Sequence, residues 1–433
     1  SRWWLHHSLA ALGEAFVRHG SRLVLRRGSA ADILAALAVE TGARAVHCTR
    51  GYEPAVVALE QAVRQRLERD GVALKRFGGS LLAEPDAIRT KAGEPYRVYT
   101  PFWRALAQGL APPRAWSPPA QLAQPQRWPS SDNLDAWKLL PTKPDWAGGM
   151  RAAWWPGEVG AQARLRAFVE DGLAGYAETR NRPDLAGTSR LSPHVHFGEL
   201  SPAACWRAAV LARETGAVRD PHVETFLKEL VWREFSHHLL FNWPTLPETP
   251  FRPEFARFPW SQQGAARTAD LVAWRRGRTG YPIVDAGMRE LWACGWMHNR
   301  VRMIVASFLV KDLRIPWQDG EAWFWDTLVD ADLAANAASW QWVAGSGADA
   351  APYFRIFNPV SQGAKFDPAG DYVRRWVPEL ARLPAGAIHA PWQADAMTLR
   401  AAGVALGRDY PLPIVDHAQA RAAALAAFAS LKS

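Results

Sequence analysis

The hydrophobic pattern of the chain changes once, and this change constrains the fold more than any other feature of the sequence. In the first part, short apolar runs at residues 23–25, 45–48 and 72–77 alternate with helical patterns at 30–39 and 54–69. Strands that alternate with helices are typical of a parallel sheet covered by helices. We therefore expect an α/β domain in the first part of the chain.

The second part of the chain is predicted to be mainly helical. Between residues 110 and 144 the sequence is rich in Pro, Ser, Gln and Trp. Proline removes a backbone donor and disrupts both regular structures, so this segment predicts a connection. Beyond it, helical periodicity dominates, most clearly at 224–241, 285–294, 299–310 and 332–343. The sequence predicts an α/β domain at 1–110, a linker at 111–150 and a helical domain at 151–433.

Composition and charge narrow the classes of function. Of the 433 residues, 48% are hydrophobic, and 51 Lys and Arg against 42 Asp and Glu give a net charge of +9. Such an excess favours polyanionic partners such as nucleic acid. The three cysteines, Cys48, Cys205 and Cys294, lack metal-ligand spacing, and no apolar run reaches the roughly 20 residues of a membrane span. We expect no metal site, no membrane segment and a cytoplasmic location.

Tryptophan and polar residues recur at helical spacing. The chain has 23 Trp residues, most of them expected in the core, although an indole can also stack on bases or carry electrons. Asp332, Asn336 and Trp340 stand at i, i+4 and i+8, so one helix face presents a carboxylate, an amide and an indole. Two further faces of this kind hold Asn299, Arg302 and Met303, and Glu229 and Trp232. We expect these faces to line a cavity.

A short segment rich in hydroxyl groups precedes a helical pattern at residues 187–193, with the sequence GTSRLSP. Hydroxyl side chains and free backbone N–H groups at a helix start can cap the helix. The same groups can hold a pyrophosphate. The residues alone leave both alternatives open.

Several longer motifs resemble the photolyase/cryptochrome family. They are GYPIVD at 280–285, WMHNRVRM at 296–303, DADLAAN at 330–336 and APYFRIFNP at 351–359, with TSRLS at 188–192 and LVWREF at 230–235. The chain is most similar to bacterial class I cyclobutane pyrimidine dimer photolyases. The resemblance implies a Rossmann-like antenna domain followed by a large helical FAD-binding domain. It also implies a photo-lyase enzyme that repairs these dimers by electron transfer from excited reduced FAD to a flipped-out lesion.

The resemblance further implies a role for individual residues, with one FAD per chain. Residues matching those around the FAD phosphates and ribityl chain are Tyr176, Thr188, Ser189, Arg190, Leu191 and Ser192. Those matching the isoalloxazine site are Arg302, Asp330, Asp332 and Asn336, the last facing flavin N5. The lesion pocket matches Glu229, Trp232, Asn299, Met303 and Trp342. Electron-transfer positions match Trp340, Trp317 and Trp260, and positions near the DNA backbone match Arg180, Arg300 and Arg355.

Three alternative functions differ from this interpretation at particular features. Six-four photolyases carry histidines at the positions of Asn299 and Met303, because that repair needs a proton donor. Plant cryptochromes carry Asp at the position of Asn336, many animal ones carry Cys, and signalling members use a long tail after the last helix. A flavin-free, basic DNA-binding scaffold would be colourless. The expected partner is damaged DNA, duplex or single-stranded, bound by a monomer.

A second, antenna chromophore is a further expectation from the resemblance. Folate-binding relatives carry a Glu at the position of Val56 and a Cys-Lys pair where this chain has Pro247 and Glu248. The folate mode is therefore disfavoured, and the identity of the antenna stays open. Because Ser1 lies in a helical pattern, we also expect the first strand-helix-strand of this domain to be missing. We accordingly expect poor antenna binding.

Overall fold

The structure, a computed structural model, describes residues 1–109, 119–350 and 354–431. The chain forms two compact units: Ser1–Ala174 with Ser189–Pro244, and Gly175–Thr188 with Thr245–Ser433. This division differs from the expected boundaries at 110 and 150, because most helices between 148 and 242 pack in the same unit as the sheet. Compact packing does not test functional domains, so the expected domain scheme stays a prediction. Residues 110–118 of the expected linker lie outside the described residues.

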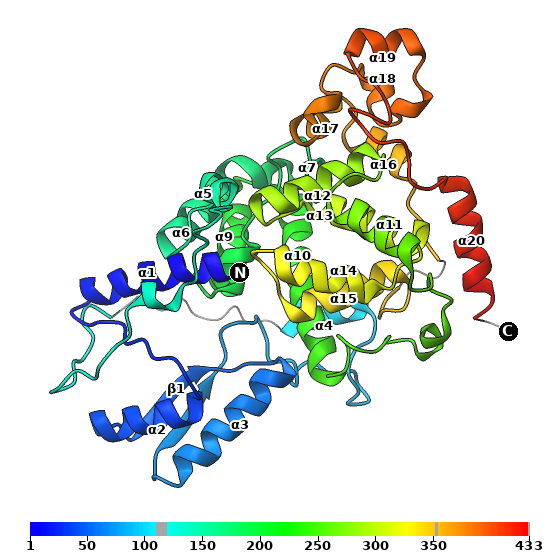
Figure 1. Cartoon of the computed structure of the whole chain (residues 1–433). Coiled ribbons are helices and arrows are strands. Elements are labelled where there is room, and N and C mark those ends of the chain that lie inside the picture. Colours follow the sequence, from blue (N-terminus) through cyan, green and yellow to red (C-terminus); the bar gives the residue numbers. More distant parts are fainter. Residues whose placement is uncertain (110–118, 351–353, 432–433) are drawn as a thin grey trace. The chain divides into compact units, whose positions relative to one another are not determined.

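The first unit contains a sheet of two parallel strands, β1 (Ala45–Thr49) and β2 (Ala73–Phe77), with Ala45 opposite Ala73. Helix α2 (Ala30–Thr41) precedes β1, and α3 (Pro54–Glu68) connects the strands (Figure 1). Buried side chains of both helices share one core with Val72. The alternation of strands and helices predicted from the hydrophobic pattern is thus confirmed from residue 30 to residue 77.

The boundaries of α2 and α3 follow from local chemistry. Ser29 caps α2, because its hydroxyl accepts a hydrogen bond from the Asp32 N–H group, and Gly42 ends the helix with a φ of 66°. Pro54 occupies the first turn of α3, where its missing N–H group costs nothing.

The expected strand at residues 23–25 does not form. The Leu25 N–H group donates to Ser131 Oγ at 2.9 Å, and the Asp132 N–H group donates to the Leu25 carbonyl oxygen at 2.7 Å. These backbone groups are therefore used by a neighbouring loop and not by a sheet. An apolar run of three residues cannot reveal which partner its backbone will have.

The remaining helices of the first unit surround its site residues. The longest, α10 (Asp220–Asn242), includes the predicted segment 224–241 and carries Glu229 and Trp232. The others are α1 (Arg2–Arg18), α4 (Tyr99–Gly109), α5 (Gly148–Ala153), α6 (Glu158–Ala167), α8 (Ser192–His196) and α9 (Pro202–Glu214). Short 3-10 helices lie at Leu134–Trp137 and Leu173–Gly175, and a π-helical turn, η2, at Phe168–Gly172.

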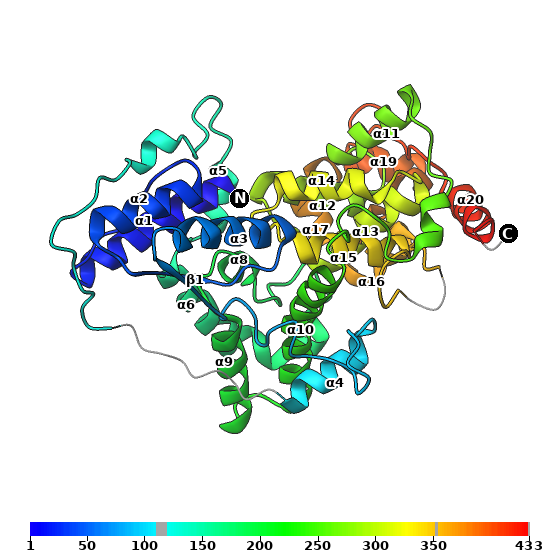
Figure 2. The ribbon, with the colours of Figure 1, turned by 90° about the horizontal axis from the view of Figure 1, so that it is seen from below.

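The second unit is helical around one large core. Four neighbouring helices are α12 (Pro282–Cys294), α13 (Asn299–Ser307), α14 (Trp317–Thr327) and α15 (Leu333–Ala344), and the last three carry most of the site residues of this unit (Figure 2). Its other helices are α7 (Tyr176–Thr179), α11 (Ala265–Arg275), α16 (Pro359–Phe366), α17 (Asp371–Trp376), α18 (Ala385–Ile388), α19 (Ala396–Ala402) and α20 (His417–Ala429). Short 3-10 helices lie at Pro253–Arg257, Pro378–Leu380 and Pro391–Gln393.

Two of the predicted helices in this unit are modified at an end. The helix expected at 299–310 is α-helical only to Ser307 and continues as a π-helical turn, η5 (Phe308–Asp312). The helix expected at 332–343 starts one residue later, because Asp332 is its N-cap. No helix in the described part of the chain is both long and apolar enough to cross a lipid bilayer.

Candidate functional site

The polar face of α15 is positioned by its cap. Asp332 Oδ1 accepts a hydrogen bond from the Ala335 N–H group at 2.8 Å, which fixes the start of the helix. One turn later Asn336 is 8% exposed, and its Nδ2 donates to the backbone oxygen of Glu321 at 3.0 Å. This bond orients the amide so that its Oδ1 is directed as an acceptor. Trp340, another turn on, is buried.

An ion pair in the same unit joins two more of the predicted cofactor residues. Arg302 Nη2 lies 2.9 Å from Asp330 Oδ2, and Arg302 Nε donates to the Met297 carbonyl oxygen at 2.8 Å. The Asp330 side chain is only 3% exposed, so this charge is kept in the interior by its arginine partner. The second unit therefore brings Arg302 and Asp330 into contact, with Asp332 two residues beyond.

Glu321 on α14 is a polar residue of this region that the sequence interpretation missed. Its side chain is buried, and its Oε1 has no hydrogen-bond partner within the described ranges 1–109, 119–350 and 354–431. Burial raises the pKa of this carboxyl to about 8. Its spacing of four residues from Trp317 was a usable signal, since both fall on one helix face.

These observations fit a flavin. The isoalloxazine ring presents hydrogen-bond donors and acceptors along one edge, so its site must offer both kinds of group. The second unit supplies them through the Arg302–Asp330 pair and the Asn336 amide. A buried carboxyl oxygen without a partner, as at Glu321, is uncommon unless a further group completes the site. Among the described residues, no group of three His, Cys, Asp or Glu side chains could hold a metal ion.

The three tryptophans of the expected electron path all belong to the core of the second unit. Trp340 meets Trp274 and Phe324 edge to face, with ring centroids 6.2 Å and 5.0 Å away. A Cβ atom at Gly320 would overlap the Trp340 ring, so α14 approaches the indole closely at this residue. Trp317 begins α14 and is also buried, while the half-buried Trp260 packs on the same core.

Arginines gather around the start of α13. His298 caps this helix through Nδ1, which accepts from the Arg300 N–H group at 3.2 Å. Burial, followed by the charges of Arg300, Arg302 and Arg180, lowers the pKa of His298 to about 3. The imidazole is therefore neutral at physiological pH, with its proton on Nε2. The expected DNA-backbone residues Arg180 and Arg300 thus lie near each other.

The expected lesion residues of the second unit occupy two places. On α13, Asn299 is exposed and Met303 is half-buried, one turn apart. Trp342, near the end of α15, donates from its Nε1 to the Asp349 carbonyl oxygen at 3.1 Å. The guanidinium of the exposed Arg355 lies 5.9 Å from the Trp342 ring. Residues 351–353 of the motif at 351–359 lie outside the described residues.

The lesion residues of the first unit are neighbours on α10. Glu229 and Trp232 are both partly exposed and lie three residues apart, on one helix face. Tyr99 stacks on Trp232 with ring centroids 3.7 Å apart and an interplanar angle of 4°. The sequence interpretation missed this contact, because Tyr99 and Trp232 are distant in the chain.

The segment expected to hold phosphate has an unusual backbone. Arg190 has a φ of 52°, and its guanidinium lies 4.4 Å from the centre of the Trp154 ring. Helix α8 starts at Ser192, and its N-cap residue, Leu191, provides no side-chain cap. Burial and the charge of Arg190 lower the pKa of Arg164, which places a second arginine near this segment. On α7 the buried Tyr176 lies under Arg180, 5.8 Å from its guanidinium.

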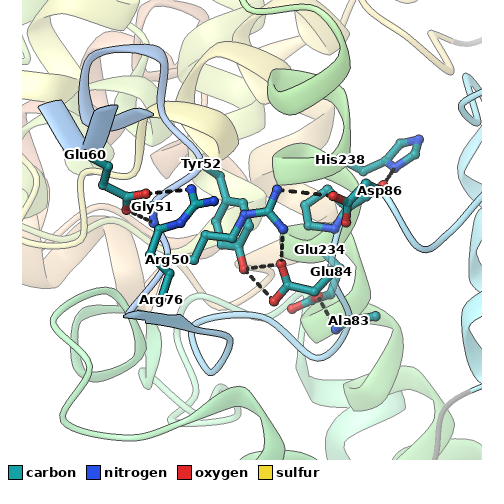
Figure 3. Close-up of polar contacts among 11 residues, drawn as sticks. Arg50, Gly51, Tyr52, Glu60, Arg76, Ala83, Glu84, Asp86, Glu234 and His238 are labelled. Carbon is teal, nitrogen blue, oxygen red and sulfur yellow. Dashed lines mark hydrogen bonds and ion pairs between the residues drawn. The ribbon is translucent and has the colours of Figure 1, made fainter. Parts of the chain in front are cut away.

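A network of ion pairs occupies the carboxyl ends of the two strands (Figure 3). Arg50 pairs with Glu84 at 2.6 Å and with Asp86 at 3.2 Å, and the Tyr52 hydroxyl donates to Glu84 at 3.0 Å. The Gly51 N–H group donates to Glu60 at 2.6 Å. Ligands of open α/β sheets commonly bind at this edge. In this chain, the polar groups at this edge of the sheet form ion pairs and hydrogen bonds with one another.

Comparisons with known proteins bear on this arrangement. Residues 226–430 match the family model described as the FAD binding domain of DNA photolyase, and residues 1–122 match the model described as DNA photolyase. A deoxyribodipyrimidine photo-lyase of Agrobacterium fabrum is 54% identical over 99% of this chain and 88% of its own length.

Two solved structures resemble the whole chain. A bacterial class III photolyase from Agrobacterium tumefaciens has a TM-score of 0.96 at 54% identity, covering 100% of this chain and 88% of its own. A cryptochrome of Synechocystis has a TM-score of 0.87 at 30% identity, covering 98% of this chain and 87% of its own.

The fold and the polar helix faces define a flavin-binding helical protein with a parallel-sheet domain before it. The chain belongs to the photolyase/cryptochrome family. The family resemblance, the two-part fold, the FAD cofactor and the photo-lyase type of enzyme expected from the sequence are thereby confirmed. The Agrobacterium tumefaciens structure is described as class III, and the expected closeness to class I stays a prediction.

Proposed function

We propose that this chain repairs cyclobutane pyrimidine dimers in DNA by light-driven electron transfer to a flipped-out lesion. The observation that carries the proposal is the amide of Asn336, which donates through Nδ2 to the Glu321 backbone and directs Oδ1 as an acceptor. An acceptor at this position suits the N–H group of a fully reduced flavin, the form that repair requires. Arg302, Asp330 and Asp332 would hold the same ring system.

The lesion would be bound by side chains that replace the stacking and pairing it loses in the duplex. Extruding a base costs a few kcal/mol, and less for a damaged one. Stacking on the indoles of Trp232 and Trp342 offsets this cost by about 1–3 kcal/mol per base. Glu229 and Asn299 would form hydrogen bonds with the polar edges of the dimer, and Met303 would contact its apolar part.

When bound, reduced FAD supplies one electron to the dimer on excitation and takes it back after the ring has opened. The protein's part is to hold both molecules and to exclude competing reactions. Thr188, Ser189, Arg190, Leu191 and Ser192, with Tyr176, would bind the phosphate and ribityl part of FAD. Trp260, Trp317 and Trp340 would carry electrons from the protein surface inward. Arg180, Arg300 and Arg355 would contact DNA phosphates.

Repair of cyclobutane dimers, and not of six-four photoproducts, is supported by α13. The resemblance places two histidines in six-four enzymes where this chain has Asn299 and Met303. The nearest histidine, His298, is neutral at physiological pH because burial lowers its pKa to about 3. It is therefore a poor proton donor. This region suits a reaction that moves an electron without a proton.

The proposal is tested by illuminating the reduced, FAD-loaded protein without oxygen. The substrate is an oligonucleotide with a single thymine dimer, and a second oligonucleotide carries a six-four product. We expect light-dependent loss of the dimer only, with no change in the dark. In Trp340→Phe, photoreduction of oxidised flavin should be lost while repair by chemically reduced protein is kept. Repair of the six-four oligonucleotide, or of neither, would refute the proposed specificity.

A cryptochrome-type photoreceptor is the second candidate, favoured by the similarity to the Synechocystis cryptochrome. It predicts light-dependent reduction of the oxidised flavin, and no loss of the dimer when the reduced protein is illuminated. We further propose a cytoplasmic monomer that acts on damaged duplex or single-stranded DNA.

A second chromophore, bound in a mode other than that of folate, stays part of the proposal. Arg50 forms ion pairs with Glu84 and Asp86 at the carboxyl ends of the strands. Because these polar groups already bind one another, the ion pairs support weak binding of the second chromophore at this edge of the sheet.

A further inference from the structure

Tyr99 and Trp232 form a close face-to-face contact. Their ring centroids are 3.7 Å apart, and the planes differ by 4°. Tyr99 starts α4 and is only 7% exposed, whereas Trp232 on α10 is partly exposed. A phenol ring at this distance covers one whole face of the indole. Any base that stacks on Trp232 must therefore use its other face.

The tyrosine ring is itself held at two points. Its hydroxyl donates to the Lys228 carbonyl oxygen on α10 at 2.7 Å, one turn before Trp232. Phe235 meets Tyr99 and Trp232 edge to face, with centroids 5.9 Å and 6.0 Å away. Neither the phenol nor the indole can rotate without losing one of these contacts. These contacts hold the two stacked rings in one orientation against α10.

The chain leading to Tyr99 is fastened to the same helix. Glu234 accepts from the Leu82 N–H group at 2.8 Å, and His238 Nε2 accepts from the Tyr96 N–H group at 3.0 Å. His238 Nδ1 also contacts the Pro85 carbonyl oxygen at 3.2 Å. Burial lowers the pKa of His238 to about 4, so both contacts persist with a neutral ring at physiological pH. These contacts fix the register of α4 against α10.

We propose that Tyr99 is a positioning residue for lesion binding: it holds the Trp232 indole in the orientation that receives an extruded pyrimidine. This inference rests on the proposed function. A tryptophan that is free to rotate loses side-chain entropy when a base stacks on it, and this loss weakens binding. A tryptophan already backed by a tyrosine avoids that loss. Tyr99 thus acts through Trp232 and need not touch the lesion.

The test compares Tyr99→Leu and Tyr99→Phe in the FAD-loaded protein. In Tyr99→Leu, binding of a thymine-dimer oligonucleotide should weaken about five-fold, the effect of one aromatic pair. Binding of undamaged DNA, FAD content and repair at saturating enzyme should not change. Tyr99→Phe keeps the stack and should stay within about two-fold of wild type. Phe102→Leu is the matched control, since Phe102 lies on α4 and its ring meets Tyr96, Phe235 and His238, whereas the ring that stacks on Trp232 is that of Tyr99.

A double-variant comparison separates positioning from general damage to the fold. In a Trp232→Leu background, Tyr99→Leu should weaken dimer binding no further, because its effect passes through the indole. Additive losses, or an equal loss in Phe102→Leu, would overturn the inference. A loss in Trp232→Leu without one in Tyr99→Leu would overturn the inference and leave the proposed function intact. No loss in Trp232→Leu would overturn the inference and exclude Trp232 from the lesion pocket, whereas the proposed function itself is tested by the repair experiment.

Discussion

At the scale of single residues, the buried carboxyl of Glu321 should make stability depend on pH. Burial raises its pKa from an ordinary 4.5 to about 8. The folded protein then binds a proton that the unfolded chain releases between these values, so its contribution to stability is full below pH 4.5 and is lost as the pH rises through 8. Between these two pH values, the free energy of unfolding should fall by about 1.4 kcal/mol per pH unit.

Glu321→Gln should remove this dependence. Between pH 5 and pH 8 we expect the melting temperature of the wild type to fall relative to that of the variant, because glutamine stays uncharged. The measurement is thermal unfolding of both proteins across this range. The control is Glu158→Gln, a change at an exposed residue in the first turn of α6. Its melting temperature should follow that of the wild type across this pH range, because Glu321 is unchanged. Parallel pH profiles of Glu321→Gln and wild type would contradict the assignment.

Side-chain roles were predictable only where helical spacing or a family motif revealed them. Asp332, Asn336 and Trp340 stand at regular spacing, and the structure places them on α15 or at its cap. Glu321 lies four residues after Trp317 on α14, but its importance comes from burial, which one sequence does not display. The contact of Tyr99 with Trp232 depends on tertiary packing and could not be predicted from either segment alone. The roles assigned to these residues in catalysis stay predictions.

At the scale of elements, the crossing of α14 and α15 depends on one glycine. A Cβ atom at Gly320 would overlap the Trp340 ring. Gly320→Ala should therefore destabilise the protein by about 1–3 kcal/mol and displace the indole, despite the better helix propensity of alanine. Gly386→Ala in α18 is the matched control, because a Cβ there meets no atom within 4 Å. Denaturant unfolding measures both, and equal stabilities would contradict the close approach.

The last helix is attached to the core through a hydrogen bond between a histidine and a buried carboxyl group. His417 starts α20, and its Nδ1 lies 2.5 Å from Asp312 Oδ1 in the π-helical turn η5. Removing the hydrogen-bond partner of a buried polar group typically costs about 1–3 kcal/mol. His417→Ala should therefore increase hydrogen exchange in α20 and lower the melting temperature. The exposed His47→Ala is the control and should behave as wild type. Unchanged exchange in α20 would show that the pair does not hold the helix.

The elements themselves were largely predictable, and the exceptions have physical causes. Helix α2 was predictable because Ser29 and Gly42 mark its ends in the sequence. The π-helical turn η5 was not, since hydrophobic periodicity does not distinguish an α-helix from one that widens at its end. The apolar run at 23–25 resembles a strand, but its backbone bonds to a loop.

At the scale of the whole molecule, the net charge of +9 should govern DNA binding. Each phosphate contact releases counterions, so the logarithm of the association constant should fall steeply with the logarithm of salt concentration. Arg300→Gln should lower the magnitude of this slope by about 0.9, the effect of one contact. Arg408→Gln is the control, because Arg408 is exposed and paired with Asp409. The measurement is a salt titration of binding to damaged duplex, and an unchanged slope would exclude Arg300 from phosphate contact.

The division of the molecule into compact units was the least predictable feature. Composition changes at the Pro-rich segment, yet most of the helices that follow it up to Pro244 belong to the same compact unit as the sheet. The segment Gly175–Thr188 belongs to the other unit, although its neighbours on both sides do not. Local sequence cannot reveal such an exchange, because it depends on contacts between distant residues.

The π-helical turn η5 makes the length of this segment as important as its composition. A π-helical turn holds one more residue than an α-helical turn, and every residue from Phe308 to Asp312 is buried. Deleting any one of them would rewind the segment as an ordinary helix and rotate Asp312 away from His417. The four side chains that remain would be chemically intact but out of phase with their surroundings. Evolution can therefore exchange residues here more easily than it can change their number.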